Sequence, residues 1–223
     1  MLVARGTSFA VAVIESSKHM HLDTKAYLVF IYLMLFFIPL QAQKRNYSPG
    51  YIISLEGDTL KGWVKDRSNG AFTEIYSAIR FKGKKALFRK KYKPHTIRAY
   101  ACNERVYESV PLKEETSFFR FRYVIDQSYK KVFLRVIARE EPLTYYHWEY
   151  VDDESNYLDH IPLFYLTGAR EMVRVTQGIL GLKRRSLIEY FHDCYELADA
   201  IYTKRLNEID EVYNFYLNNC IDP

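Results

Sequence analysis

Glycine is scarce in this sequence, with nine in 223 residues. Collagen-like repeats, glycine-rich linkers and low-complexity segments need far more glycine, so these classes are excluded. The chain also lacks the G-x-S-x-G nucleophile elbow, the Walker phosphate loop, the G-x-G-x-x-G dinucleotide fingerprint and the C-x-x-C pair. Dispersed catalytic carboxylates, as in glycosidases, have no fixed local spacing and are not excluded.

Aromatic residues are abundant instead, with 20 Tyr and 14 Phe. Aromatic side chains fit the half-buried surface of a pleated sheet, so this composition favours strands. Hydrophobic residues make up 48% and charged residues 26% of the chain, values typical of a folded globular protein with a core. The formal net charge of +5 is a mild excess that implies no particular partner.

An apolar segment near the N-terminus predicts export from the cytoplasm. It reads AYLVFIYLMLFFIPLQA over residues 26–42, follows Lys25, and places the small Ala42 directly before Gln43. A basic start, an apolar middle and a small residue at the exit are the features of a cleavable secretory signal. We therefore expect a signal peptide at residues 20–42, cleavage between Ala42 and Gln43, and a mature protein in the periplasm or at the outer surface.

Two further expectations concern the same region. Residues 1–19 are weakly basic and fit poorly in front of a signal, whereas Met20 would open a segment of ordinary signal length. We therefore expect translation to begin at Met20, with residues 1–19 as a mis-annotated extension. The alternative to cleavage is an uncleaved anchor at residues 26–42, because about 17 apolar residues are the lower limit for a helix that spans a bilayer.

The chain from 47 to 182 reads as a succession of short strands. Gly50–Leu55 and Leu60–Val64 flank a Gly/Asp turn and are expected to form a hairpin. Residues 119–123 alternate Phe, Arg, Phe, Arg and Tyr, which places aromatic side chains on one face of a strand. Further candidates are Thr73–Phe81, Ala86–Arg89, Thr96–Ala101, Arg105–Val110, Phe118–Ile125, Lys131–Ala138, Leu143–Val151, Leu163–Leu166 and Glu171–Val175. The spacing predicts a β-rich domain over residues 43–182, built as an antiparallel meander, a sandwich or a partly closed barrel.

The C-terminal segment, residues 183–223, carries helical patterns instead. Three potential N-cap residues are each followed by an acid three positions on: Ser186 and Glu189, Asp193 and Glu196, and Asn207 and Asp210. Apolar side chains recur with helical spacing from Cys194 to Tyr202 and from Ile209 to Cys220. We expect an amphipathic helical hairpin that turns near residues 205–207 and packs on the sheet, completing a β-rich α+β fold.

The chain has three cysteines, Cys102, Cys194 and Cys220. Cys194 and Cys220 lie almost equally far from the expected helical turn, and both fall on apolar stripes. An exported protein meets an oxidising compartment, so we predict a Cys194–Cys220 disulfide, with two buried free thiols as the alternative. Cys102 is left unpaired and is more typical of a buried thiol than of a nucleophile.

The strongest charge feature is the segment Lys82–Lys93, which holds seven cations and no acid. One interpretation is an anion-binding patch for nucleic acid, lipopolysaccharide or an anionic membrane surface. The other is a solvated hairpin whose lysines protect an edge strand against aggregation. We favour the solvated hairpin, and export argues against nucleic acid. The cations are Lys82, Lys84, Lys85, Arg89, Lys90, Lys91 and Lys93.

No residue spacing indicates a metal or cofactor. Residues 152–154 and Asp159 gather four carboxylates near His160, but the segment lacks the Gly and the distant Glu of an EF-hand loop. The histidines show no H-E-x-x-H pattern or other paired ligand spacing. We therefore expect no catalytic, cofactor-binding or metal-binding residues.

Short motifs stand at both ends of the predicted mature chain. The opening motifs are GYII at 50–53 and GDTLKG at 57–62. The closing pattern is YFxDCxEL at 190–197, then YN at 213–214 and Cys220. These motifs resemble those of small exported proteins of Bacteroidetes-type bacteria, and the resemblance implies a compartment and an architecture. It carries over no catalytic residues, because the group has no established activity.

These observations support three functional hypotheses. The first is a non-catalytic envelope or periplasmic module that binds another envelope protein or a surface component. The second is a hydrolase with dispersed carboxylates. The third is a surface-associated protein that makes peripheral membrane contact through the Lys82–Lys93 patch. A pocket lined by converging carboxylates or histidines would favour the hydrolase.

Overall fold

The structure is a computed structural model that describes residues 47–67, 78–117, 120–151 and 158–221. All described residues lie in one compact unit, Asn46–Pro223. The predicted signal peptide at 20–42, the extension at 1–19 and the cleavage site between Ala42 and Gln43 lie outside the described residues.

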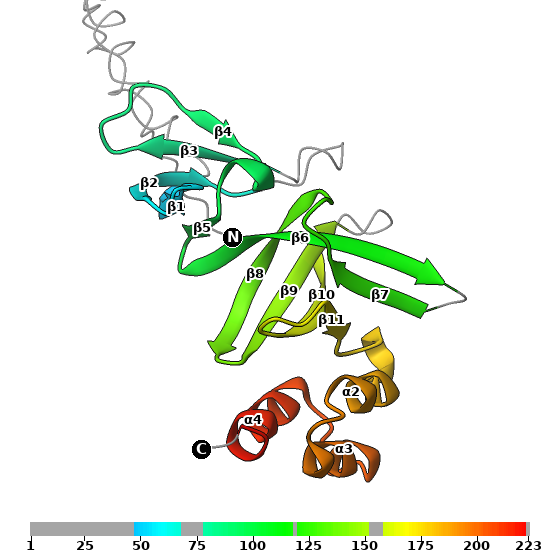
Figure 1. The fold of residues 1–223 in the computed structure, drawn as a ribbon. Coiled ribbons are helices and arrows are strands. Elements are labelled where there is room, and N and C mark those ends of the chain that lie inside the picture. Colours follow the sequence, from blue (N-terminus) through cyan, green and yellow to red (C-terminus); the bar gives the residue numbers. More distant parts are fainter. Residues whose placement is uncertain (1–46, 68–77, 118–119, 152–157, 222–223) are drawn as a thin grey trace, which may run out of the picture. The chain divides into compact units, whose positions relative to one another are not determined.

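The described strands form a single antiparallel sheet of eleven strands in the order β4-β3-β2-β1-β5-β6-β7-β11-β10-β9-β8 (Figure 1). Strand β6 pairs with β8 as well as with β5 and β7, so the six strands from β6 to β8 in this order close into a barrel. The predicted β-rich fold is confirmed, and the barrel closes fully. The strands are β1 (Ser48–Ile53), β2 (Thr59–Lys65), β3 (Ile79–Gly83), β4 (Lys90–Tyr92), β5 (Ala99–Cys102), β6 (Arg105–Ser117), β7 (Arg120–Ile125), β8 (Lys131–Glu140), β9 (Leu143–Val151), β10 (Leu158–Leu166) and β11 (Glu171–Arg174).

The barrel interior is apolar and is filled by side chains. Each of the six barrel strands contributes one buried residue to a single cluster, as expected when side chains alternate across a strand wall. The ring of Tyr123 meets that of Trp148 edge to face, with centroids 5.8 Å apart. The six residues are Leu112, Tyr123, Leu134, Tyr146, Leu163 and Met172.

Strands β1 to β5 extend the sheet beyond the barrel and build a second core with β6 and β8. Tyr100 stacks on Tyr107 at 4.6 Å between ring centroids, and Phe133 of β8 meets Tyr100 edge to face. Beside this core, the guanidinium of Arg67 pairs with the carboxylate of Glu149 at 2.6 Å. Their side chains are only 4% and 5% exposed, so the ion pair is part of the packed interior.

Three helices follow the strands in the described chain: α2 (Arg184–Tyr190), α3 (Tyr195–Tyr202) and α4 (Ile209–Asn219). They cover the outer face of the barrel, where Tyr145, Phe164 and Val173 join the helical residues in one core cluster. The expected hairpin is present as α3 and α4, and α2 precedes it. None of the helices in the described ranges is long and apolar enough to cross a membrane.

A disulfide closes this helical segment. Cys194 is the N-cap residue of α3, Cys220 is the C-cap residue of α4, and their sulfur atoms are bonded. The pair predicted from the sequence is therefore the bonded pair in the structure. Cys102 is a buried free thiol on β5.

Several predicted boundaries need correction. Ala86–Arg89 is not a strand, because Leu87 and Phe88 are exposed in a loop and pairing resumes only at Lys90. The predicted strand Thr96–Ala101 begins later, at Ala99, because Pro94–Thr96 forms a 3₁₀ turn. Strand β10 is longer than expected and begins at Leu158.

The predicted N-caps are also displaced. Helix α2 begins at Arg184, before Ser186, and the N-cap of α3 is Cys194 in place of Asp193. For α4 the cap lies one residue later than expected, at Glu208. There the Glu211 carboxylate accepts the backbone N–H groups of Asn207 at 2.6 Å and Glu208 at 3.1 Å. A capping box is thus present at α4, shifted along the chain by one residue.

Candidate functional site

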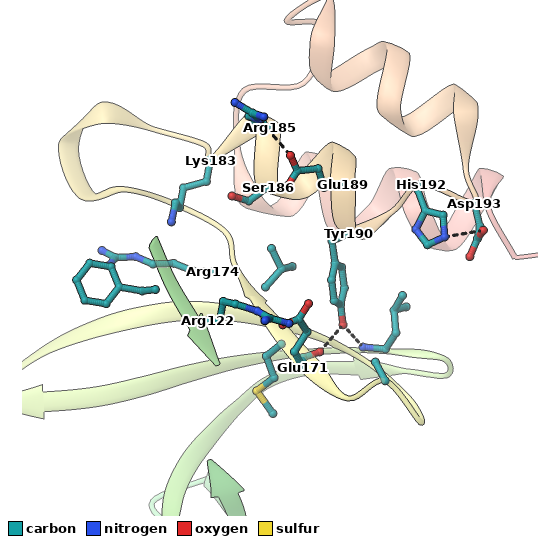
Figure 2. Close-up of a pocket in the computed structure, with 15 residues that line it drawn as sticks. Arg122, Glu171, Arg174, Lys183, Arg185, Ser186, Glu189, Tyr190, His192 and Asp193 are labelled. Carbon is teal, nitrogen blue, oxygen red and sulfur yellow. Dashed lines mark hydrogen bonds and ion pairs between the residues drawn. The ribbon is translucent and has the colours of Figure 1, made fainter. Parts of the chain in front are cut away.

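A hollow of about 820 Å³ lies between the barrel wall and helix α2. Its lining comes from β7, β10, β11, the turn between β10 and β11, α2 and the segments on either side of α2, so the site depends on the tertiary fold. Figure 2 shows the polar side chains that reach it from the barrel and from the helical side. They are Arg122, Glu171, Arg174, Lys183, Arg185, Ser186, Glu189, Tyr190, His192 and Asp193.

Tyr190 ties α2 to the barrel at the edge of the hollow. Its hydroxyl accepts a hydrogen bond from the N–H of Leu166 at 2.9 Å and donates one to the carbonyl oxygen of Glu171 at 3.2 Å. Burial raises the pKa of this hydroxyl above its ordinary value, so it stays protonated and keeps both bonds. Phe121, which is 43% exposed, and the partly buried Leu166 give the neighbouring wall an apolar character.

Two of the cations in the hollow are neutralised by carboxylates. Arg122 pairs with Glu171 through two nitrogen atoms, at 2.8 and 2.9 Å from the same oxygen. On α2, Arg185 pairs with Glu189 at 3.1 Å in an i,i+4 arrangement. Both pairs lie on the rim of the hollow. Each pair has no net charge, so neither adds excess charge to the rim.

Arg174 and Lys183 have no such carboxylate partner among the described residues. The Nε of Arg174 donates to the carbonyl oxygen of Thr176 at 2.7 Å. Within the described ranges, no carboxylate lies within ion-pairing distance of Arg174 or Lys183. Figure 2 shows the side chain of Lys183 pointing from the helical side toward Arg174. Burial lowers the pKa of Lys183, and the positive charge of Arg174 lowers it further. An anion bound between these two cations would relieve their repulsion.

The segment between β11 and α2 holds Lys183 in this position. Its two ends pair with each other, because the N–H of Lys183 donates to the carbonyl oxygen of Val175 at 2.8 Å and Thr176 bridges to Leu182. The chain can reverse between them because Gly178 and Gly181 take φ angles of 66° and 76°, which favour glycine. The hairpin-like return places Lys183 beside the strand that carries Arg174.

No known relative is found. No protein-family model matches the chain, and neither curated proteins nor solved structures include a match. The resemblance to exported proteins of Bacteroidetes-type bacteria therefore stays a prediction.

The basic run, interpreted from the sequence as a solvated hairpin or an anion-binding patch, lies away from the hollow in the fold, on β3, β4, the loop between them and Lys93 after β4. Six of its seven cations are exposed, and Lys82 is partly buried. Strand β4 is the last strand of the sheet order, so the lysines do flank an edge strand. The residues of this run are Lys82, Lys84, Lys85, Arg89, Lys90, Lys91 and Lys93.

The other candidates from the sequence that fall on described residues form no reactive site there. Burial raises the pKa of the Cys102 thiol, and its sulfur lies 3.8 Å from the carbonyl oxygen of Val64, so a thiolate nucleophile is disfavoured there. Residues 152–154 of the acidic segment lie outside the described residues. In the described part of the chain, no group of three or more His, Cys, Asp or Glu side chains is placed to hold a metal ion.

Asp159 and His160 of the acidic segment are described and lie on β10. The His160 ring stacks on His147 of β9, with centroids 3.9 Å apart. The Tyr145 hydroxyl lies 2.7 Å from Nε2 of His147. Burial lowers the pKa of His147 to about 4, helped by the charges of His160 and Arg135, so this imidazole is neutral at ordinary pH.

Sequence reasoning missed Arg174 and Lys183. They are nine residues apart, and no motif links them; the glycines at 178 and 181 are the one local sign that the chain turns back between them. Finding the site from sequence would have required the β7–β11 pairing and the packing of α2.

Proposed function

We propose that the protein is an exported, non-catalytic binding module and that the hollow binds a small molecule with a carboxylate or phosphate group. The observation that carries the proposal is the pair of cations, Arg174 and Lys183, that line one concave site with no described carboxylate within ion-pairing distance of either. The apolar wall at Phe121 and Leu166 suits a ligand that also carries a hydrocarbon or ring portion.

Binding is favoured over hydrolysis by the pairing of the carboxylates. Glu171 is held by Arg122 and Glu189 by Arg185, so neither is free to act as a nucleophile or to donate a proton. Asp193, 3.1 Å from His192, is almost fully exposed and faces water as much as the hollow. The hydrolase hypothesis needs a pair of unengaged acids, and these contacts do not favour it.

The Cys194–Cys220 disulfide supports export, because such bonds persist in oxidising compartments and are rare in the cytosol. Intact mass of the protein recovered from the envelope fraction tests this part. A chain beginning at Gln43 supports export with cleavage, and a chain that keeps residues 26–42 supports the anchored alternative.

The binding site is tested with phenyl phosphate as the probe, because it combines an anion with an apolar ring. We expect saturable chemical-shift changes in amide groups near residues 172–174 and 183. The variants Arg174→Gln and Lys183→Met should each weaken binding by about tenfold to hundredfold, since one charged hydrogen bond contributes about 1.5–3 kcal/mol.

Arg185→Gln is the matched control, because Arg185 lies on the same rim, is 82% exposed and is already paired with Glu189. It should change the affinity by less than twofold. An equal loss of affinity in all three variants would mean that binding depends on the overall positive charge and not on Arg174 and Lys183. That result would contradict the proposed site. Absence of saturation with the wild-type protein would contradict it as well.

A further inference from the structure

The loop between β3 and β4 exposes two large apolar side chains. Leu87 is 87% exposed and Phe88 is 84% exposed. The loop, residues 84–89, starts with a turn in which the N–H of Ala86 donates to the carbonyl oxygen of Gly83 at 3.0 Å. Figure 1 shows the chain leaving β3 in a wide excursion before it returns as β4. Adjacent apolar side chains at a loop tip contribute nothing to the core, which suggests a partner that receives them.

Cations surround this apolar tip. Lys84 and Lys85 precede it, Arg89 follows it, and Lys90 and Lys91 come next on β4. Arg89 and Lys90 lie over the rings of Tyr47 and Tyr92. Across the described residues, no carboxylate pairs with any cation of the Lys82–Lys93 segment. The described residues therefore do not neutralise the charge of the loop.

One face of the sheet beside the loop also combines an exposed aromatic side chain with cations. Trp63 of β2 pairs with Lys82 of β3 and is 46% exposed. In the neighbouring register, Lys65 lies opposite Arg80, and Arg80 lies opposite Lys91. Because side chains alternate along a strand, these residues share the face opposite to the buried Val64 and Phe81. An exposed Trp among cations is typical of protein surfaces that meet the headgroup layer of a membrane.

We propose that this hairpin docks on an anionic lipid bilayer, with Leu87 and Phe88 inserted among the headgroups and the flanking cations on the lipid phosphates. The occupant is a bilayer because the site combines unpaired positive charge with an aliphatic and an aromatic side chain side by side. A polysaccharide or nucleic acid would engage the cations and leave Leu87 in water. The lipid surface accounts for both features.

The electrostatic and the apolar contributions to membrane binding are each large enough to be measured separately by mutation. A basic residue near an anionic surface contributes about 1 kcal/mol, which is roughly fivefold in the partition coefficient. Reversing three charges should therefore weaken binding by roughly hundredfold or more. Replacing both apolar side chains at the tip should weaken it by about tenfold through lost burial of hydrocarbon.

The experiment is vesicle co-sedimentation of the chain from Asn46 to Pro223. This unit is compact by itself, and it omits the apolar segment 26–42, which would bind lipid on its own account. The vesicles are phosphatidylcholine alone, or phosphatidylcholine mixed with phosphatidylglycerol. We expect binding to the mixed vesicles at low salt, little binding to phosphatidylcholine alone, and a partial loss at high salt.

The charge variant is Lys84→Glu with Lys85→Glu and Lys90→Glu. Its matched control reverses three exposed cations elsewhere, Lys130→Glu with Arg170→Glu and Lys204→Glu, so the net charge is identical. The tip variant is Leu87→Ser with Phe88→Ser, which leaves the charge unchanged. Circular dichroism melts confirm that each variant is folded.

The proposal requires a strong loss in the charge variant, a clear loss in the tip variant, and a much smaller effect in the charge-matched control. Equal losses in the charge variant and its control would overturn it, since binding would then follow net charge alone. It would also be overturned if the tip variant bound like the wild type while an oligonucleotide competed fully with vesicles, because that result describes a polyanion site.

Discussion

Removal of the disulfide is the sharpest test of the helical segment. The bond joins the residue before α3 to the residue after α4, which are 26 positions apart with Cα atoms 5.5 Å apart. In the chain-entropy model, closing a loop of this length restricts the unfolded chain by about 3.5 kcal/mol at room temperature. The double variant Cys194→Ala with Cys220→Ala should therefore lower the free energy of unfolding by about that amount. The midpoint of thermal unfolding should fall by roughly 7–14 °C.

The assay is urea unfolding followed by circular dichroism, with and without reductant. For the wild-type protein, reductant should reproduce the loss seen in the double variant, and reductant should leave the double variant itself unchanged. Cys102→Ala is the control, because Cys102 is a free thiol buried on β5. Its response to reductant should equal that of the wild type.

A loss below about 1 kcal/mol in the double variant would refute the reasoning, because the constraint on the unfolded chain would then be far weaker than the loop length implies. A reductant effect that persists in the double variant would also refute it. In that case the sensitive bond would not join Cys194 and Cys220.

Two other predictions follow from the packing and the pKa values. In Gly62→Ala the new Cβ would overlap the carbonyl oxygen of Lys82 and lie 2.8 Å from the Phe81 ring, so urea unfolding should show a loss of about 2 kcal/mol. Gly83→Ala, whose Cβ would meet nothing closer than 3.7 Å, should cost less than 1 kcal/mol by the same assay; equal losses would contradict the steric argument. The pKa of His147 is lowered from 6.5 to about 4, so between these values the unfolded chain binds a proton that the folded chain does not. Stability should fall as the pH drops through this window, and the fall should be shallower in His147→Gln; an NMR titration midpoint of His147 near 6.5 would contradict it.

The elements with strong local signals were predictable from the sequence. Strand β9 has the predicted bounds, Leu143–Val151, because its alternating aromatic residues face the barrel interior and the helix-covered outer wall in turn. The disulfide was predictable because the helical spacing placed both cysteines at corresponding ends of a hairpin. In each case the information lay within one short segment.

Features that depend on distant pairing were not predictable in this way. Barrel closure depends on the pairing of β6 with β8, in which Val106 lies opposite Val136. The sequence of neither strand indicates that it pairs with the other. The segment 86–89 was mistaken for a strand because Leu87 and Phe88 have strand-like composition, while nothing local shows that they lack a partner. The cations Arg174 and Lys183 became a site only once α2 was packed against β11.

The closure of the barrel on β6 also determines how copies of the protein could join through their backbones. An open sheet has two edges, so it can add strands at both and grow without limit. Here one end of the sheet folds back on β6, and among the described strands β4 is the one terminal strand of the order. Two molecules that met at β4 would join their sheets through the one terminal strand that each offers. The strand order therefore favours a closed pair over the open-ended addition that a sheet with two terminal strands permits.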